Sequence, residues 1–94
     1  MASPASPIAA TFGRNLATAR KRSGFSQEEV AVRASLHRTE IGLLERGERM
    51  PRIDTAIKLA GAVSVPVAAL LEGIEWTPGL TRPGAFVTGG SRSD

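Results

Sequence analysis

Several residue types are absent or scarce in this chain of 94 residues, and each absence excludes a class of site. There is no cysteine, which excludes a disulfide framework, a thiolate metal site and a cysteine nucleophile. The single histidine, His37, cannot form a multi-histidine metal site, so we expect no bound metal. No apolar run approaches the ~18 residues of a membrane-spanning helix. The start of the chain lacks the charge and the long apolar stretch of a secretory signal, so we expect a cytoplasmic protein without membrane contact.

The remaining composition is that of an ordinary globular protein, with 41% hydrophobic and 22% charged residues. This length allows one domain with one small core. Nothing resembles a glycine-rich phosphate loop, and no serine has a histidine and a carboxylate that the sequence places beside it. We therefore expect neither an enzyme nor a cofactor.

The positive charge is concentrated in one half of the chain. Residues 14–58 hold ten basic and six acidic residues, whereas residues 59–94 hold two basic and three acidic ones. Such an asymmetry indicates a surface that faces a polyanion, although a merely solvated charged surface would give the same count.

Helical patterns separated by short breakers predict an all-α fold. Residues 1–7 are expected to form a flexible arm, residues 8–72 the domain, and residues 73–94 a Gly- and Pro-rich tail. Five short helices are expected near residues 8–22, 26–34, 37–45, 51–63 and 66–71.

Local signals support the helix ends and the buried faces. Gly24 suits a left-handed helix end, and Ser26 with Glu29 forms a capping box for the second helix. The apolar spacing predicts the following buried side chains: Phe12, Leu16, Ala19, Val30, Ala31, Ile41, Leu44, Ile53, Ala56 or Ile57, Ala60, Val63, Val67, Leu70 and Leu71.

The most informative segment runs from Gln27 to Arg46, where two short helices are joined by a short break. The second of these helices begins with His37, Arg38 and Thr39, which are all hydrogen-bonding residues. Donors in the first turn of such a helix can reach base edges in the major groove of DNA.

The sequence here resembles the lambda-repressor/Cro-like helix-turn-helix family of bacterial and phage regulators, also called the xenobiotic-response-element family. The resemblance covers about 60 residues, from Phe12 to Leu71. It is carried by FGRNLATARKRSGFSQEEVA and by HRTEIGLLERGERMPRIDTAIKLAGAVSVPVAALL, in which many family landmarks stand in register. The resemblance implies a five-helix DNA-binding domain that reads double-stranded DNA with its third helix.

The resemblance also assigns base-reading positions on this sequence. Gln27 matches a glutamine that holds a phosphate and braces the recognition helix, and Arg38 and Thr39 match the outward base-reading positions. His37 would contact a base or the backbone. Leu43 stands where relatives often carry a polar reader, so it would contact a thymine methyl or serve as packing or dimer surface.

Further positions match backbone contacts and a structural pair. Arg46, Arg49 and Arg52 fall in the loop that grips the DNA backbone. Arg20 and Glu45 match an ion pair that links the first and third helices, so Arg20 is expected to be partly buried and away from DNA.

The sequence departs from the family pattern in two places. The family prefers glycine in the turn between the second and third helices, where this chain has Ser35, so an adjusted turn is expected. On the third helix, Gly42 and Leu43 replace polar residues, so a narrow direct readout of bases is expected. Gly42 also costs about 1 kcal/mol inside a helix, which indicates a close approach at that point by another helix or by DNA.

The tail carries Trp76 and Phe86, which make it too apolar for a plain linker. It would fold back onto the domain, build a dimer contact with the fifth helix, or order on meeting a partner. Residues 85–88 could form a strand paired across a dimer, and the last residues are expected to be disordered.

These features together predict a homodimeric repressor that reads a palindromic operator and is associated with the nucleoid when bound. The alternative is an antitoxin-like or controller protein whose tail binds a protein partner.

Overall fold

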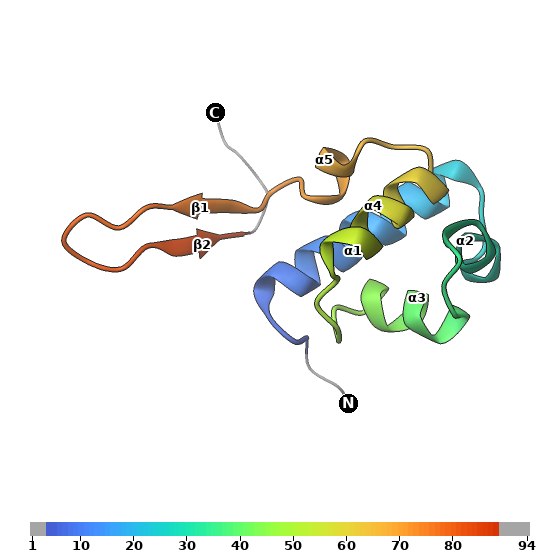
Figure 1. Cartoon of the computed structure of the whole chain (residues 1–94), viewed down its shortest axis with the longest axis horizontal. Coiled ribbons are helices and arrows are strands. Elements are labelled where there is room, and N and C mark those ends of the chain that lie inside the picture. The colour runs from blue at the N-terminus through green and yellow to red at the C-terminus, as the bar shows by residue number, and fades with distance from the viewer. Residues whose placement is uncertain (1–3, 89–94) are drawn as a thin grey trace.

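The computed structural model describes residues 4–88, which form a bundle of short helices followed by a hairpin (Figure 1). The elements are α1 (Pro7–Ser23), α2 (Gln27–Ala34), α3 (Arg38–Glu45), α4 (Ile53–Ala62), α5 (Val67–Leu70), β1 (Glu75–Thr77) and β2 (Ala85–Val87). The five expected helices are confirmed. The last residues, expected to be disordered, lie outside the described part. Within residues 4–88, no helix combines the length and the apolarity needed to cross a membrane.

Helix α1 begins one residue before the expected start because Ser6 caps it. The Ser6 hydroxyl accepts a hydrogen bond from the Ala9 N–H at 3.1 Å, and Pro7 occupies the first turn, where its missing N–H costs nothing. The Ala5 N–H also donates to the Gly47 carbonyl at 2.6 Å. The second half of the arm expected over residues 1–7 is therefore held against the helical domain.

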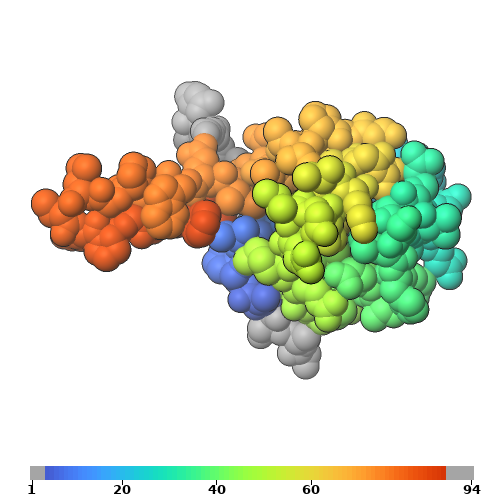
Figure 2. All heavy atoms as spheres, viewed as in Figure 1, coloured from blue at the N-terminus to red at the C-terminus, as the bar shows by residue number. Residues whose placement is uncertain are grey.

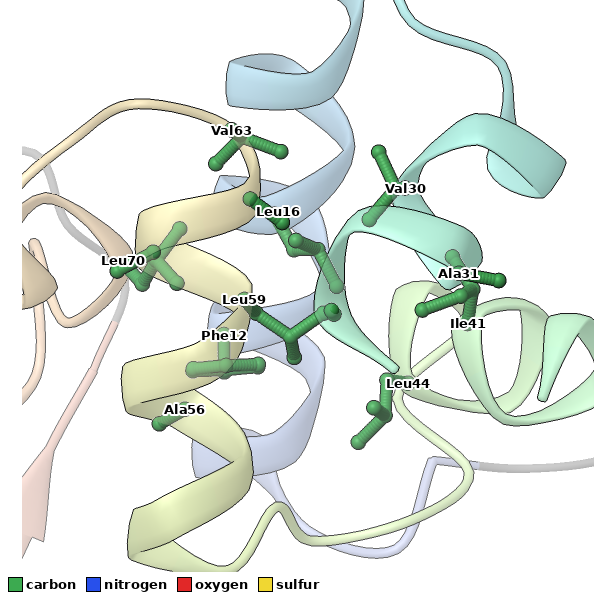
Figure 3. Packing of buried hydrophobic residues seen from close by; sticks show 13 residues of the cluster. Phe12, Leu16, Val30, Ala31, Ile41, Leu44, Ala56, Leu59, Val63 and Leu70 are labelled. Atoms are coloured by element: carbon green, nitrogen blue, oxygen red, sulfur yellow. The ribbon is translucent and has the colours of Figure 1, made fainter. Parts of the chain in front are cut away.

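The core is formed by large apolar side chains from all five helices (Figure 3). Helix α1 packs against α3 and α5, α2 packs against α3 and α4, and α4 packs against α5, so the five helices enclose one core (Figures 1 and 3). The large side chains with almost no exposed surface are Phe12, Leu16, Val30, Ile41, Leu44, Leu59, Val63 and Leu70. Each such burial contributes roughly 1.5–3 kcal/mol relative to exposure, which holds the helices at fixed angles.

The predicted apolar faces of the last two helices are wrong in part. Ile53 is 82% exposed, whereas Leu59, which was not predicted, is fully buried. Of the two alternatives Ala56 and Ile57, Ala56 is the buried one and Ile57 is 58% exposed. Ile53 and Ile57 lie one turn apart, so both fall on the same face of α4, beside the face that packs into the core. Leu71 is also exposed, because α5 ends at Leu70 and Leu71 already lies beyond the helix.

The tail forms an antiparallel hairpin that extends from the helical body (Figure 1). Trp76 lies opposite Phe86, and their rings meet edge to face at 5.0 Å. A side chain on Gly84 would come within 2.5 Å of the Trp76 ring, so the indole packs directly on that backbone. The strand that we expected to pair across a dimer thus pairs with β1 of its own chain.

Candidate nucleic-acid interface

The connection between α2 and α3 is tight because Ser35 adopts a left-handed conformation, with φ of 56°. Its N–H donates to the Val32 carbonyl at 3.2 Å, and the Leu36 N–H donates to the Ala31 carbonyl at 2.9 Å. These bonds end α2 in the way that a glycine would, so serine preserves the turn that we expected to be adjusted. A left-handed serine costs roughly 1–2 kcal/mol, which the buried contacts of the two helices offset.

The start of α2 is fixed by the capping box that the sequence predicted. The Ser26 hydroxyl accepts from the Glu29 N–H at 3.0 Å, and the Glu29 carboxylate accepts from the Ser26 N–H at 2.7 Å. Gln27 is consequently the first residue of α2, at the edge that faces α3.

Helix α3 begins at Arg38, because His37 serves as its cap rather than as a residue of its first turn. The Thr39 N–H donates to His37 Nδ1 at 3.2 Å. With Nδ1 acting as an acceptor, the neutral ring carries its proton on Nε2, which is therefore a donor. His37, Arg38 and Thr39 are all exposed, so the start of α3 presents a run of hydrogen-bonding side chains.

Arg38 is the most prominent cation of this run. Its nearest carboxylate is that of Glu28, with Arg38 Nε 3.8 Å from Glu28 Oε2, and both side chains are more than half exposed. An exposed pair at this distance contributes about 1 kcal/mol at most, so Arg38 can turn to another anion at little cost. Arg38 also borders a shallow hollow together with Arg20, Ser26 and Gln27.

Three further arginines follow α3, and each has an acidic neighbour on the same surface. The nitrogen–oxygen distances are 2.7 Å for Arg46 with Glu48, 2.9 Å for Arg49 with Glu40, and 3.3 Å for Arg52 with Asp54. All three arginine side chains are more than half exposed. The predicted backbone-gripping residues thus lie at the surface, in pairs that an anion can open.

A buried polar cluster fixes α3 against α1 and α2. Arg20 Nε and Nη2 donate to the two carboxylate oxygens of Glu45 at 2.5 and 3.0 Å, and Gln27 Nε2 donates to Glu45 Oε1 at 3.0 Å. Arg20 Nη1 also donates to the Phe25 carbonyl at 3.1 Å. We call Arg20, Gln27 and Glu45 the helix clamp, because each comes from a different helix.

The clamp has a clear electrostatic signature. The hydrogen bond to Glu45 raises the pKa of Arg20 above its ordinary value, although burial by itself lowers that pKa. Arg20 and Glu45 form the ion pair expected from the resemblance, and only 14% and 8% of the two side chains is exposed. Gln27 holds α3 in place by donating a hydrogen bond to the Glu45 carboxylate. Its position at the start of α2 also leaves it beside the hollow that Arg38 borders.

A glycine accounts for the close approach of α3 to α1. At Gly42 the expected approach of another helix is not seen, because the nearest atom to where a side chain would begin is Arg46 Nη1 at 3.1 Å, and Arg46 is the cap of α3 itself. Sequence reasoning missed Gly13 of α1, where a side chain would lie 2.5 Å from the Glu45 carbonyl oxygen. A glycine in the middle of a long helix was the available signal, because its cost there requires a reason. Leu43, beside Gly42, is half-buried.

Known proteins share both this sequence pattern and this geometry. The helix-turn-helix family model matches residues 16–70. An uncharacterised HTH-type transcriptional regulator of Sinorhizobium fredii, y4dJ, is 37% identical over 70 residues, which are 74% of this chain and 91% of that protein. The control protein C.SmaI of Serratia marcescens is 40% identical over 60 residues, which are 64% of this chain and 71% of that protein.

The fold is also found among solved structures. The restriction-modification controller protein C.AhdI of Aeromonas hydrophila matches with a TM-score of 0.64 and 34% identity, over 66% of this chain and 94% of that one. The family match and the relatives agree with the paired helices α2 and α3 and with the run of polar residues that starts α3. The chain therefore belongs to the lambda-repressor/Cro-like helix-turn-helix family that its sequence resembles.

Proposed function

We propose that this protein is a transcriptional regulator that binds double-stranded DNA in a sequence-specific manner, with α3 in the major groove. The observation that carries the proposal is the start of α3, where His37, Arg38 and Thr39 are exposed together on a helix held rigidly by the clamp. A fixed helix with exposed donors in its first turn suits direct recognition of bases. Action on DNA implies a location in the cytoplasm, at the nucleoid.

The residues divide into two roles. Arg38 and Thr39 read bases, with His37 Nε2 as a further donor, and Leu43 lies one turn along the same helix. Gln27, Arg46, Arg49 and Arg52 hold phosphates and set the register of the protein on the duplex. The exposed pairs that these three arginines make are weak enough for phosphate to replace the carboxylate.

The protein acts as a homodimer on an approximately palindromic operator. Two copies of α3 reach successive major grooves when they lie about 34 Å apart, one turn of the duplex. Bound at an operator, the dimer represses by blocking RNA polymerase, and this is the mode of action that we propose.

Selection from a randomised duplex library at physiological salt tests the function. An enriched palindrome with half-sites about one helical turn apart is the expected result. Salt-sensitive binding without any enriched sequence would refute sequence-specific recognition by α3.

Two substitutions then separate the roles on the selected operator. Arg38→Ala should weaken operator binding by about 1–3 kcal/mol while leaving binding to random duplex nearly unchanged. Arg46→Ala should weaken binding to both duplexes alike, because a phosphate contact carries no sequence information. If Arg38→Ala instead weakens binding to random duplex and keeps the preference for the operator, Arg38 contacts phosphate and does not read a base.

The relatives favour one particular kind of regulator. C.SmaI is named a control protein, and C.AhdI is named a restriction-modification controller protein. This supports a second candidate, in which the chain controls the genes of a restriction-modification system. Footprinting on its own upstream region and on that of its neighbouring genes tests this candidate. Protection ahead of a restriction endonuclease gene supports it, and protection only elsewhere refutes it.

A further inference from the structure

An apolar groove lies between the start of α1, the start of α4 and α5, and Arg52, which we propose to hold a phosphate, stands at its edge. Its volume is about 310 Å³. The side chains that form most of its rim and walls are Ile8, Met50, Ile53, Ile57, Val67 and Leu71. Ile53 and Ile57 stand on the face of α4 that the core leaves uncovered, so these two side chains, which the helical spacing offered for the core, line this groove instead.

The hairpin carries a second exposed apolar surface. Every residue of β1 and β2 is exposed, Trp76 and Phe86 are each 55% exposed, and Leu80 at the tip is 97% exposed. The hairpin stands clear of the helical body in the space-filling view (Figure 2). A lone two-stranded hairpin is marginally stable in water, so a hairpin with this much exposed apolar surface gains stability by packing against another surface.

The hairpin begins at the rim of the groove. Leu71 lines the groove, and its carbonyl accepts from the Ile74 N–H at 3.0 Å, one residue before β1. Gly73, with φ of 84°, turns the chain there and directs it away from its own helices. The helix-turn-helix match ends at residue 70, so the hairpin lies outside the part of the chain that the family model describes.

We propose that the hairpin of each copy docks in the groove of a second copy, so that two chains exchange hairpins about a two-fold axis. Each chain supplies one hairpin and one groove, and a two-fold exchange fills both without leaving either free. The hairpin leaves its own chain beside the groove, so both contacts lie close to the axis and form one continuous interface. This rests on the homodimer of the proposed function and assigns its surface.

The areas are consistent with a specific dimer. The exposed halves of Trp76 and Phe86 amount to roughly 200 Å² per hairpin, because an aromatic side chain buries 150–250 Å² in full. If each groove loses about the same area as the hairpin that covers it, two such contacts bury roughly 800 Å² in total. Leu80, Val87 and the backbone are not included in this sum. Specific interfaces bury about 1,200–2,000 Å² in total, so Leu80, Val87 and the backbone of the hairpin must supply the remaining part of the interface.

Trp76 is the one tryptophan of the chain, so its fluorescence reports on the hairpin directly. When the full-length protein is diluted, sedimentation should show the dimer dissociating. The Trp76 emission should shift to the red over the same concentrations. Ile57→Glu, in the groove, should weaken the dimer about 30-fold or more and give the red-shifted emission at all concentrations. Val32→Glu is the matched control, because Val32 is 80% exposed on α2 and does not line the groove.

Mixing two variants distinguishes exchange from other dimers. Phe86→Ser damages the hairpin face and Ile57→Glu damages the groove, so neither variant should dimerise alone. Mixed together, they should form heterodimers, since the intact hairpin of the Ile57→Glu chain fits the intact groove of the Phe86→Ser chain. The heterodimer should be weaker than the wild-type dimer and at least about tenfold stronger than either variant homodimer.

Each other outcome overturns the proposal. A dimer retained in Phe86→Ser excludes the hairpin from the interface, and one retained in Ile57→Glu excludes the groove. Loss of both dimers without a heterodimer excludes exchange, as does wild-type protein that stays monomeric with exposed Trp76. Binding of the Ile57→Glu monomer to a single half-site tests DNA recognition separately, so failure of the exchange and failure of the proposed function are distinguishable.

Discussion

Replacing Glu45 with glutamine should weaken the contacts between the three helices that the clamp joins, and so destabilise the folded protein. The carboxylate accepts from Arg20 through both of its oxygens and from Gln27 through one, and only 8% of its side chain is exposed. Glutamine offers one acceptor oxygen and places an NH2 group where the other oxygen stood. That group then faces a donor of Arg20 or of Gln27, so at least one buried donor loses its partner.

The magnitude follows from these contacts. A hydrogen bond to a charged group is worth about 1.5–3 kcal/mol, and breaking a buried ion pair costs about 3–5 kcal/mol. Because Arg20 keeps some exposure and one backbone acceptor, we expect Glu45→Gln to lower the free energy of unfolding by about 3 kcal/mol. For a domain of this size, that corresponds to a fall in Tm of roughly 12–24 °C.

Urea and thermal unfolding followed by circular dichroism measure this effect. Glu48→Gln is the matched control, because Glu48 pairs with the exposed Arg46 and its loss should cost less than about 1 kcal/mol. High salt should remove the effect of Glu48→Gln and leave most of the effect of Glu45→Gln. A loss below about 1 kcal/mol for Glu45→Gln, equal to the control, would refute the view that the clamp holds α3 in place.

The pH dependence of the clamp has a definite sign. The pKa of Arg20 is raised in the folded state, so its contribution is fully present below the unfolded value and is lost as pH rises through the folded value. An arginine pKa lies far above neutral pH and that of Arg20 is raised further, so Arg20 contributes no pH dependence between about pH 6 and 9. The difference in stability between wild type and Arg20→Met should accordingly stay constant over that window.

Three further substitutions probe the frame around α3 by urea unfolding. Ser35→Gly should stabilise the protein by about 0.5–1 kcal/mol, because glycine adopts the left-handed conformation freely; a loss would show that the serine side chain has a role of its own. Asn15→Ala should cost about 1–2 kcal/mol, since Asn15 Nδ2 donates to the carbonyls of Leu70 and Glu72 at 2.9 Å each, and an unchanged stability would mean that water replaces these bonds. Gly13→Ala should cost about 1–3 kcal/mol despite better helix propensity, because its methyl group collides with the backbone of α3, and a gain in stability would show that α1 and α3 can separate freely.

Features encoded by local chemistry could be predicted from the sequence. The five helices follow from apolar spacing and end signals, and the capping box of Ser26 and Glu29 forms as predicted because its partners are three residues apart. The helix-turn-helix region was identified from many landmarks in register rather than from one motif. The contact of Arg20 with Glu45 spans 25 residues and could be expected only through the resemblance.

Features decided by tertiary packing could not be predicted in this way. Ala56 and Ile57 fit the helical period equally well, and only the packing of α4 against the other helices decides that Ala56 is buried and Ile57 exposed. The strands of the hairpin have three residues each, too few for an alternating pattern to show. Their pairing depends on the contact of Trp76 with Phe86 and on the close fit over Gly84, which no local signal reveals.

The acidic partners of the surface arginines affect the net number of ions that would be released when DNA binds. When a phosphate replaces Glu48 beside Arg46, the duplex releases a counterion, but the freed carboxylate gathers a cation of its own from solution. The same exchange occurs where Arg49 leaves Glu40. The net number of ions released is then smaller than the number of phosphates held. If Arg46 and Arg49 hold phosphates as proposed, the affinity for DNA should therefore change less with salt than the number of these arginines alone predicts.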